Sequence, residues 1–201
     1  MSKASKSILF IITVLILDQS LKIWIKTNMT LGQEIHVIGN WFILHFIENN
    51  GMAFGMEFAG KVGKLILSIF RIIAVIGIGW YLSILIKKDT SYGLIFSISA
   101  ILAGAVGNII DSAFYGVFFS DSTYFQVANL FPSEGGYSSF LHGRVVDMLY
   151  FPVLKGNYPS WFPWNAGGEF IFFRPVFNLA DSSITIGVFS ILIFQKRFFK
   201  E

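Results

Sequence analysis

The chain of 201 residues contains no cysteine, and its histidines are few and scattered. Without cysteine it can form no disulfide, no thiolate nucleophile and no cysteine-based metal site. The three histidines, His36, His45 and His142, lack the spacing of metal ligands. We therefore expect no metal site.

Charged residues are also scarce, at 13% of the chain, which is about half of the usual share in a soluble domain. Hydrophobic residues make up 54%, and the mean hydropathy is +0.66. A chain of this composition cannot bury its apolar surface in one soluble core, which indicates an integral membrane protein. The net charge is +3, but the basic residues are spread along the chain, so we expect no nucleic-acid partner.

Four apolar segments are long enough to span a bilayer, which requires about 20 helical residues. They cover about residues 8–25, 65–86, 92–110 and 176–194. Lys3 and Lys6 precede the first as they would in a signal peptide, but Asp18 and Gln19 follow without a cleavage site, so we expect this segment to be retained. The sequence has no internal repeat and no linker, which predicts a single membrane domain over residues 1–201.

The orientation in the membrane follows from the basic residues, which favour the cytoplasmic side. With both termini in the cytoplasm, only Asp89 and Glu201 oppose the basic residues on that side. Those basic residues are Lys3, Lys6, Lys87, Lys88, Lys196, Arg197 and Lys200. We therefore expect both termini to be cytoplasmic.

Two segments, about 27–64 and 112–174, would then be extracytoplasmic. In the first, aromatic and β-branched residues are broken by Gly-Asn and Asn-Gly, which is typical of short strands or a hairpin. The second is too long for a structureless loop and should fold or carry function; its phenylalanines, Trp161 and Trp164 suit the membrane–water interface. The predicted fold is an all-α membrane protein with four transmembrane helices, a small extracytoplasmic β-element and an aromatic-rich extracytoplasmic loop.

Two aspartates lie in apolar sequence. Asp181 lies in FNLADSSITIGVFSILIF, about seven residues below the expected outer end of its helix, and a carboxylate in hydrocarbon costs at least about 2.5 kcal/mol. Such a residue indicates a functional site; the structural alternative is an ion pair with Lys22 or Arg71. Asp147 lies in GRVVDMLYF, and two carboxylates that share a proton form an acid–base catalyst. Asn178, three residues before Asp181, would share its helix face.

Two further clusters combine a possible site with a structural alternative. Asp18 and Lys22 are four residues apart and can pair on one helix face, either as a structural ion pair or in contact with a substrate. Asn49 and Gly51 lie in ENNGMAFG, whose glycines and asparagines allow a positive φ; the alternative is a plain turn.

The last cluster lies at the outer end of the third apolar segment. Asn108 and Asp111 are three residues apart and share a helix face; the alternative is a polar helix end in the headgroup region. Gly104 and Gly107 allow a neighbouring helix to approach closely.

These clusters, in this order, resemble those of the lipoprotein signal peptidases (signal peptidase II), a family of intramembrane aspartic peptidases. The resemblance covers all four predicted helices. Each motif alone is weak, but five in order with a matching topology are specific. The motifs are Asp18-Gln19-x-x-Lys22, Asn49-x-Gly51-x-Ala53-Phe54, Gly107-Asn108-x-x-Asp111, Gly143-x-Val145-Val146-Asp147 and Phe177-Asn178-x-Ala180-Asp181-Ser182.

The resemblance implies that Asp147 and Asp181 form a catalytic dyad that requires no cofactor. It implies as substrate a bacterial prolipoprotein with a diacylglyceryl group on its cysteine, cut just before that cysteine on the extracytoplasmic side of the inner membrane. We expect a monomer in contact with membrane lipid. The residues implied to support the site or bind substrate are Asp18, Lys22, Asn49, Gly51, Asn108, Asp111 and Asn178.

The sequence departs from the family pattern in two respects. The family usually has arginine directly after the aspartate that matches Asp111, and here that residue is Ser112. Arg144 or Arg174 could supply the missing contacts, or these contacts are absent. The stretches on either side of Asp147 also look longer than usual, and the extra aromatic-rich sequence could form a lid or a platform lying on the membrane.

A small membrane transporter or a proton-conducting subunit is the alternative function, since it too would place aspartate and lysine inside helices. It predicts charged groups at several depths, together with broken or repeated helices. Here the polar groups gather toward one face of the membrane, which favours a one-sided peptidase site. A purely structural scaffold does not account for five costly polar clusters.

Overall fold

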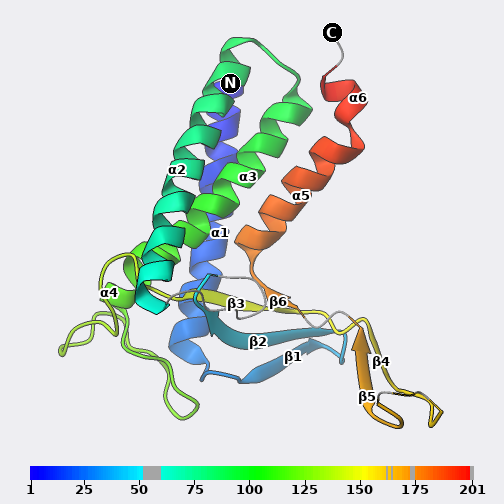
Figure 1. Cartoon of the computed structure of the whole chain (residues 1–201). Coiled ribbons are helices and arrows are strands. Elements are labelled where there is room, and N and C mark those ends of the chain that lie inside the picture. Colours follow the sequence, from blue (N-terminus) through cyan, green and yellow to red (C-terminus); the bar gives the residue numbers. More distant parts are fainter. Residues whose placement is uncertain (52–59, 162, 164, 173–174, 200–201) are drawn as a thin grey trace.

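The computed structural model describes residues 1–51, 60–161, 163, 165–172 and 175–199. In this part of the chain, three helices are long and apolar enough to cross a membrane, and a shorter apolar helix lies beside them. The three are α1 (Lys3–Asn28), α2 (Gly60–Lys87) and α3 (Tyr92–Ile110), which continues through the π-helical turn η2 (Asp111–Tyr115) and α4 (Gly116–Phe118). The shorter one is α5 (Leu179–Ile193), followed by α6 (Gln195–Phe198). Figure 1 shows the N-terminal end and α6 at one end of this bundle and the strands at the other.

The predicted segments agree with the first three helices. The segment 92–110 coincides with α3, and the segments 8–25 and 65–86 lie within α1 and α2, which extend further at both ends.

The prediction of the fourth helix, over about residues 176–194, is wrong at its start. Val176 and Phe177 form strand β6 (Val176–Phe177), which pairs with a strand of the sheet, and Asn178 is the N-cap of α5. Asp181 therefore lies in the first turn of its helix and not deep inside it. Asn178 lies at the helix boundary and not on a helix face.

Glycines allow α3 and α5 to pack closely, as predicted. A Cβ atom added to Gly104 would lie 2.1 Å from the carbonyl oxygen of Ala180 in α5, and one added to Gly187 would lie 2.6 Å from the carbonyl oxygen of Ser97 in α3. Side chains of any size at these positions would separate the two helices, so the glycines fix the distance at which α5 lies.

A four-stranded antiparallel sheet lies at the strand end of the bundle (Figure 1). Its strands, in spatial order, are β1 (Glu34–Ile38), β2 (Phe42–Asn49), β3 (Val145–Tyr150) and β6. The predicted hairpin is confirmed, because β1 pairs with β2 across a turn in which Gly39 has a φ of +51°. All of β3 is buried, so this strand can hold a carboxylate away from water.

A hydrophobic core lies where the sheet meets α1. Phe46 of β2, Val146 and Met148 of β3, and Ile25 of α1 are fully buried in it. Because successive side chains of a strand point to opposite faces, Asp147 between Val146 and Met148 points away from this core.

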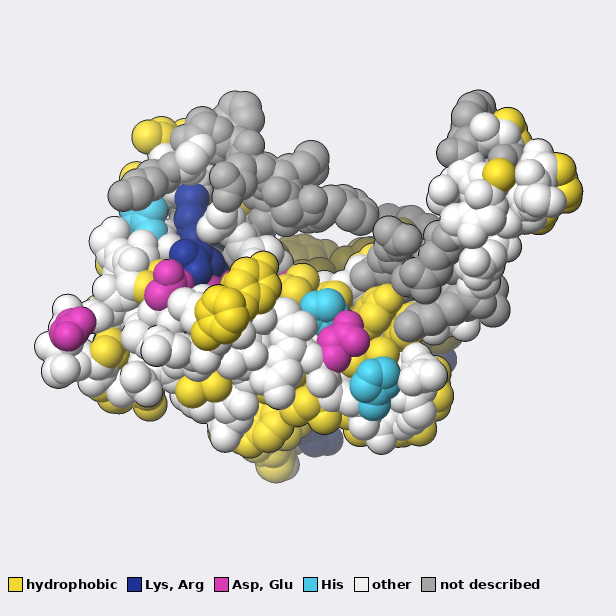
Figure 2. All heavy atoms as spheres, turned by 90° about the horizontal axis from the view of Figure 1, so that it is seen from below, with side chains coloured by type: hydrophobic (Ala, Val, Ile, Leu, Met, Phe, Trp, Pro, Cys, Tyr) yellow, Lys and Arg dark blue, Asp and Glu magenta, His cyan; other side chains and the backbone are white. Residues whose placement is uncertain are grey.

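The segment 112–174 contains more structure than a loop. Besides β3, it forms a separate hairpin of β4 (Leu154–Asn157) and β5 (Glu169–Phe172), which projects from the rest of the molecule in Figures 1 and 2. Phe125 and Trp161 are 92% and 78% exposed. Trp164, the other tryptophan expected at the membrane interface, lies outside the described residues.

The close approach of α3 and α5 can be tested with one methyl group. In Gly104→Ala the new methyl group would meet the backbone of α5, so the helices must separate, which costs about 1–3 kcal/mol. We expect a lower unfolding temperature in detergent. Gly77→Ala in α2 is the matched control, because a Cβ atom there meets nothing within 4 Å. Equal unfolding temperatures for the two variants would contradict the close approach.

Candidate active site

Asp147 lies on β3 between two asparagine side chains. The Nδ2 of Asn178 donates to its Oδ1 at 2.7 Å, and the Nδ2 of Asn49 donates to its Oδ2. Asp147 is only 2% exposed. Burial raises the pKa of Asp147 to about 8, and repulsion from Asp181 acts in the same direction. This carboxyl group is therefore protonated at neutral pH.

Asp181 lies in the first turn of α5, and the same asparagine holds it. The Oδ1 of Asn178 accepts from the backbone N–H of Asp181 at 2.8 Å, which caps the helix. The Nδ2 of Asn108, from α3, donates to the Oδ1 of Asp181 at 2.7 Å. Asn178 thus binds the side chain of Asp147 with one end of its amide and the backbone of Asp181 with the other.

Lys22 of α1 lies behind this pair and is completely buried. Its Nζ lies 3.0 Å from Asp18 Oδ2 and 2.8 Å from Asp111 Oδ2, and it donates to Asn108 Oδ1 at 3.0 Å. The predicted pairing of Asp18 with Lys22 is confirmed, as is the shared face of Asn108 and Asp111. Asp111 is fully buried and is not a polar helix end among headgroups.

The two aspartates that hold Lys22 also hold the backbone of neighbouring elements. Asp18 Oδ1 accepts from the N–H of Ala180 at 2.9 Å, at the start of α5. Asp111 Oδ2 accepts from the N–H of Val146 at 3.2 Å, next to Asp147. Gln19, which the motif contained but the candidate set did not, donates to Asp111 Oδ1 at 2.9 Å.

Gly51 and Arg71 complete the network on the side of α2. Gly51 has a φ of +86°, and its N–H donates to Asn49 Oδ1 at 2.5 Å. The Nη2 of Arg71 donates to the carbonyl oxygen of Gly51. Arg71 was not among the candidate site residues, although a cation in an apolar span is itself a signal of function.

A second group of buried charges lies apart from this network. Glu48 binds Lys26, and its Oε2 accepts from Arg144 Nη1 at 3.0 Å. Arg144 also pairs with Asp121 at 2.7 Å. Arg144 is therefore bonded elsewhere and does not supply the contacts expected of an arginine at Ser112, whose own hydroxyl donates to the backbone of Asn108. Arg174, the other candidate, lies outside the described residues.

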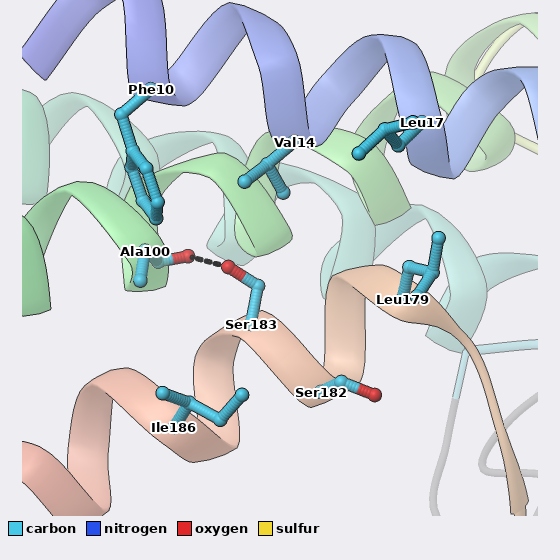
Figure 3. Close-up of a pocket in the computed structure, with 8 residues that line it drawn as sticks. All are labelled: Phe10, Val14, Leu17, Ala100, Leu179, Ser182, Ser183 and Ile186. Atoms are coloured by element: carbon cyan, nitrogen blue, oxygen red, sulfur yellow. Dashed lines mark hydrogen bonds between the residues drawn. The ribbon is translucent and has the colours of Figure 1, made fainter.

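The apolar pocket between α1, α3 and α5 in Figure 3 is not a second reactive site. Its volume is about 220 Å³, and the hydroxyl groups that line it already donate to backbone carbonyls: Ser183 to Ala100 at 2.8 Å and Ser182 to Asn178 at 3.0 Å. The pocket fits an aliphatic chain. Within the described residues, no group of three acidic or histidine side chains could hold a metal ion.

Comparison with known proteins decides the family. The chain matches the family model described as signal peptidase (SPase) II over residues 10–197. It is 51% identical over 189 residues to a lipoprotein signal peptidase of Porphyromonas gingivalis. The matched residues make up 93% of this chain and 81% of the relative. The chain belongs to the signal peptidase II family.

Other relatives agree with this result. A lipoprotein signal peptidase of Amoebophilus asiaticus is 40% identical over 185 residues, which is 90% of this chain and 73% of the relative. A solved bacterial membrane enzyme, determined by the in meso method at 2.3 Å resolution, is 28% identical, with a TM-score of 0.61 over 98% of this chain and 92% of that one. As a signal peptidase II, the protein is a multi-pass membrane protease of bacterial lipoprotein processing, which decides against the transporter.

All of the candidate residues of this signal peptidase II lie in one connected network. Asp147 and Asp181 lie at its centre, bridged by Asn178. The supporting residues around them are Asn49, Asn108, Lys22, Asp18, Asp111 and Gly51. Ala53 and Phe54, which belong to the second motif, lie outside the described residues.

Replacing Lys22 tests whether the buried cation holds the network together. Lys22→Met leaves Asp18 and Asp111 buried without a cationic partner, and breaking such a pair costs about 3–5 kcal/mol. We expect a large fall in the unfolding temperature in detergent. Lys196→Met is the control, because Lys196 is an exposed lysine of α6 with no ion pair among the described residues. Similar losses in both variants would argue against the network.

Proposed function

We propose that this signal peptidase II is an aspartic endopeptidase in which Asp147 and Asp181 are the catalytic residues. The observation that supports this most is the single side chain of Asn178, which binds both aspartates. Two neighbouring carboxyl groups in a buried site share one proton, because both cannot ionise readily. The proton resides on Asp147, whose pKa is raised to about 8 by burial and by Asp181.

The two aspartates take complementary roles in hydrolysis. The Asp181 carboxylate removes a proton from a water molecule as the water oxygen bonds to the scissile carbonyl carbon, while Asp147 gives its proton to the carbonyl oxygen. The tetrahedral intermediate then collapses: the C–N bond breaks, Asp181 returns its proton to the leaving nitrogen, and Asp147 takes back the hydroxyl proton. The pair ends in its starting state.

We further propose that the substrate is a prolipoprotein with a diacylglyceryl group on its cysteine, cut just before that cysteine. The relatives are named lipoprotein signal peptidases, and the aspartates lie at the strand end of the helices, where a signal helix would leave the bilayer. The basic Lys87 and Lys88 lie at the opposite end of α2, which supports an extracytoplasmic site and cytoplasmic termini. The protein acts as a monomer in membrane lipid.

The supporting residues position the aspartates. Lys22, Asp18 and Asp111 have no exposed side-chain surface to offer a substrate and act through Asn108, Ala180 and Val146. Asn49 and Asn178 orient the carboxyl group of Asp147.

Substitution of either aspartate tests the catalytic pair. Asp147→Asn and Asp181→Asn each remove one proton-transfer group, and we expect cleavage of a diacylated prolipoprotein to fall by at least about 10⁴-fold. Both variants should insert into membranes and purify like the wild type. Asp89→Asn, which changes an exposed carboxylate at the other end of the bundle, is the control and should cleave normally. Near-normal cleavage by either active-site variant would exclude the dyad.

Substrate specificity is tested separately with purified protein and two forms of one prolipoprotein, diacylated and non-lipidated. We expect cleavage of the first only, with the mature product beginning at the lipidated cysteine, as mass spectrometry would show. Cleavage of both forms at equal rates would contradict the lipid requirement. Cleavage of neither form would contradict the proposed function as a whole.

The pH dependence follows from the raised pKa of Asp147. A carboxyl group with a pKa of about 8 is protonated below that pH and loses its proton above it. Asp147 can act as the acid only while protonated, so the cleavage rate should fall as the pH rises through about 8. A rate–pH profile between pH 4 and pH 10 would show this, and a rate that stays constant up to pH 10 would contradict the role of Asp147.

A further inference from the structure

Arg71 is a cation of the membrane-spanning helix α2 that the proposed chemistry does not yet use. A guanidinium group is expensive within a bilayer and indicates a function by default. The side chain is half-buried and reaches the turn that follows β2, where it donates to the carbonyl oxygen of Gly51.

A continuous series of contacts leads from Arg71 to Asp147. Arg71 holds the carbonyl oxygen of Gly51, the N–H of Gly51 donates to Asn49 Oδ1 at 2.5 Å, and Asn49 Nδ2 donates to Asp147. The guanidinium group packs directly on Gly51: a Cβ atom there would lie 2.6 Å from Arg71 Nη1. Together with its φ of +86°, this contact requires glycine at position 51.

The charge of Arg71 also acts on the aspartates through space. The guanidinium group attracts Asp181 most strongly, followed by Asp111 and Asp147. Among the described residues, the other charged groups around the pair are Lys22 and Asp18 of α1 and Asp111 of η2. Lys22 already lies between two carboxylates, so its charge is largely compensated. Arg71 bonds to a neutral carbonyl, so its charge remains available to the ionised member of the pair.

We propose that Arg71 is a positioning residue of the catalytic pair: it holds the Asn49–Gly51 turn against Asp147 and supplies a positive charge to the coupled pair. This inference rests on the proposed aspartic peptidase function. It also accounts for Ser112. The cation expected at that position in η2 is supplied from α2, and the Ser112 hydroxyl instead donates to the backbone carbonyl of Asn108 in α3.

Charge and geometry can be separated with two variants of Arg71. Arg71→Gln removes a positive charge from beside the coupled pair, so we expect the acid limb of the kcat–pH profile to move up by about one pH unit. Arg71→Lys keeps the charge but loses the planar guanidinium, so the limb should stay in place while kcat falls several-fold. KM should change little in both, because the proposed role of Arg71 is to position the catalytic pair and not to bind the substrate.

Lys64→Gln is the matched control. Lys64 lies on the same helix and contacts the same turn, with its Nζ 2.8 Å from Asn50 Oδ1, but it lies outside the series of contacts to Asp147. Its profile should coincide with that of the wild type. An equal shift in Lys64→Gln and Arg71→Gln would overturn the assignment to Arg71.

Rates are compared per amount of folded protein, measured by thermal unfolding in detergent. A purely structural role for Arg71 would lower the rate of Arg71→Gln equally at every pH, and that result would overturn the proposal. If Arg71→Gln does not fold, the test uses Arg71→Lys and Gly51→Ala, because both keep the positive charge. A lower kcat with an unchanged acid limb of the pH profile supports the proposal, and a shifted acid limb overturns it. If the wild type fails to cleave the diacylated substrate, the proposed function fails; if it cleaves and the profiles do not differ, only the role of Arg71 fails.

Discussion

The two ion pairs of the buried Lys22 ammonium group are the interactions on which the rest of the structure depends. Removing an ion from water costs several kcal/mol, which close and well-placed partners must offset. Asp18 and Asp111 provide them, and their remaining oxygen capacity binds the N–H groups of Ala180 and Val146. One cation therefore fixes the end of α3, the start of α5 and the strand β3 relative to α1. These are the elements that carry both catalytic candidates.

The side chain of Asn178 connects this framework to Asp147 and Asp181. It lies between β6 and α5, where the chain changes from strand to helix, and its amide can face both ways. The oxygen caps the helix of Asp181 and the nitrogen binds Asp147, so one side chain links the two aspartates. Because the cap begins α5 at Leu179, Asp181 lies in the first turn, near the partial positive charge of the helix N-terminus.

The sequence predicted which polar residues come together better than it predicted the elements that hold them. Polar residues in apolar segments are costly, so they were singled out. Spacings of four and three residues correctly predicted the shared faces of Asp18 with Lys22 and of Asn108 with Asp111, but the same argument was wrong for Asn178 and Asp181. The start of α5 could not be predicted, because the apolar residues before Asn178 suit a strand as well as a helix and their pairing with β3 is distant in sequence. For Arg71, the sequence showed a costly charge in an apolar segment but not which group that charge contacts, since Gly51 comes from another part of the chain.

The long segment after α4 reaches the active site through β2. Successive side chains of a strand point to opposite faces, so Glu48 and Asn49 project to different sides of β2. Glu48 binds Lys26, Arg144 and the hydroxyl group of Ser122, and the last two belong to the long segment. Asn49 binds Asp147. The strand is thus held by charges on one face, while a side chain on its other face binds the carboxyl group of Asp147.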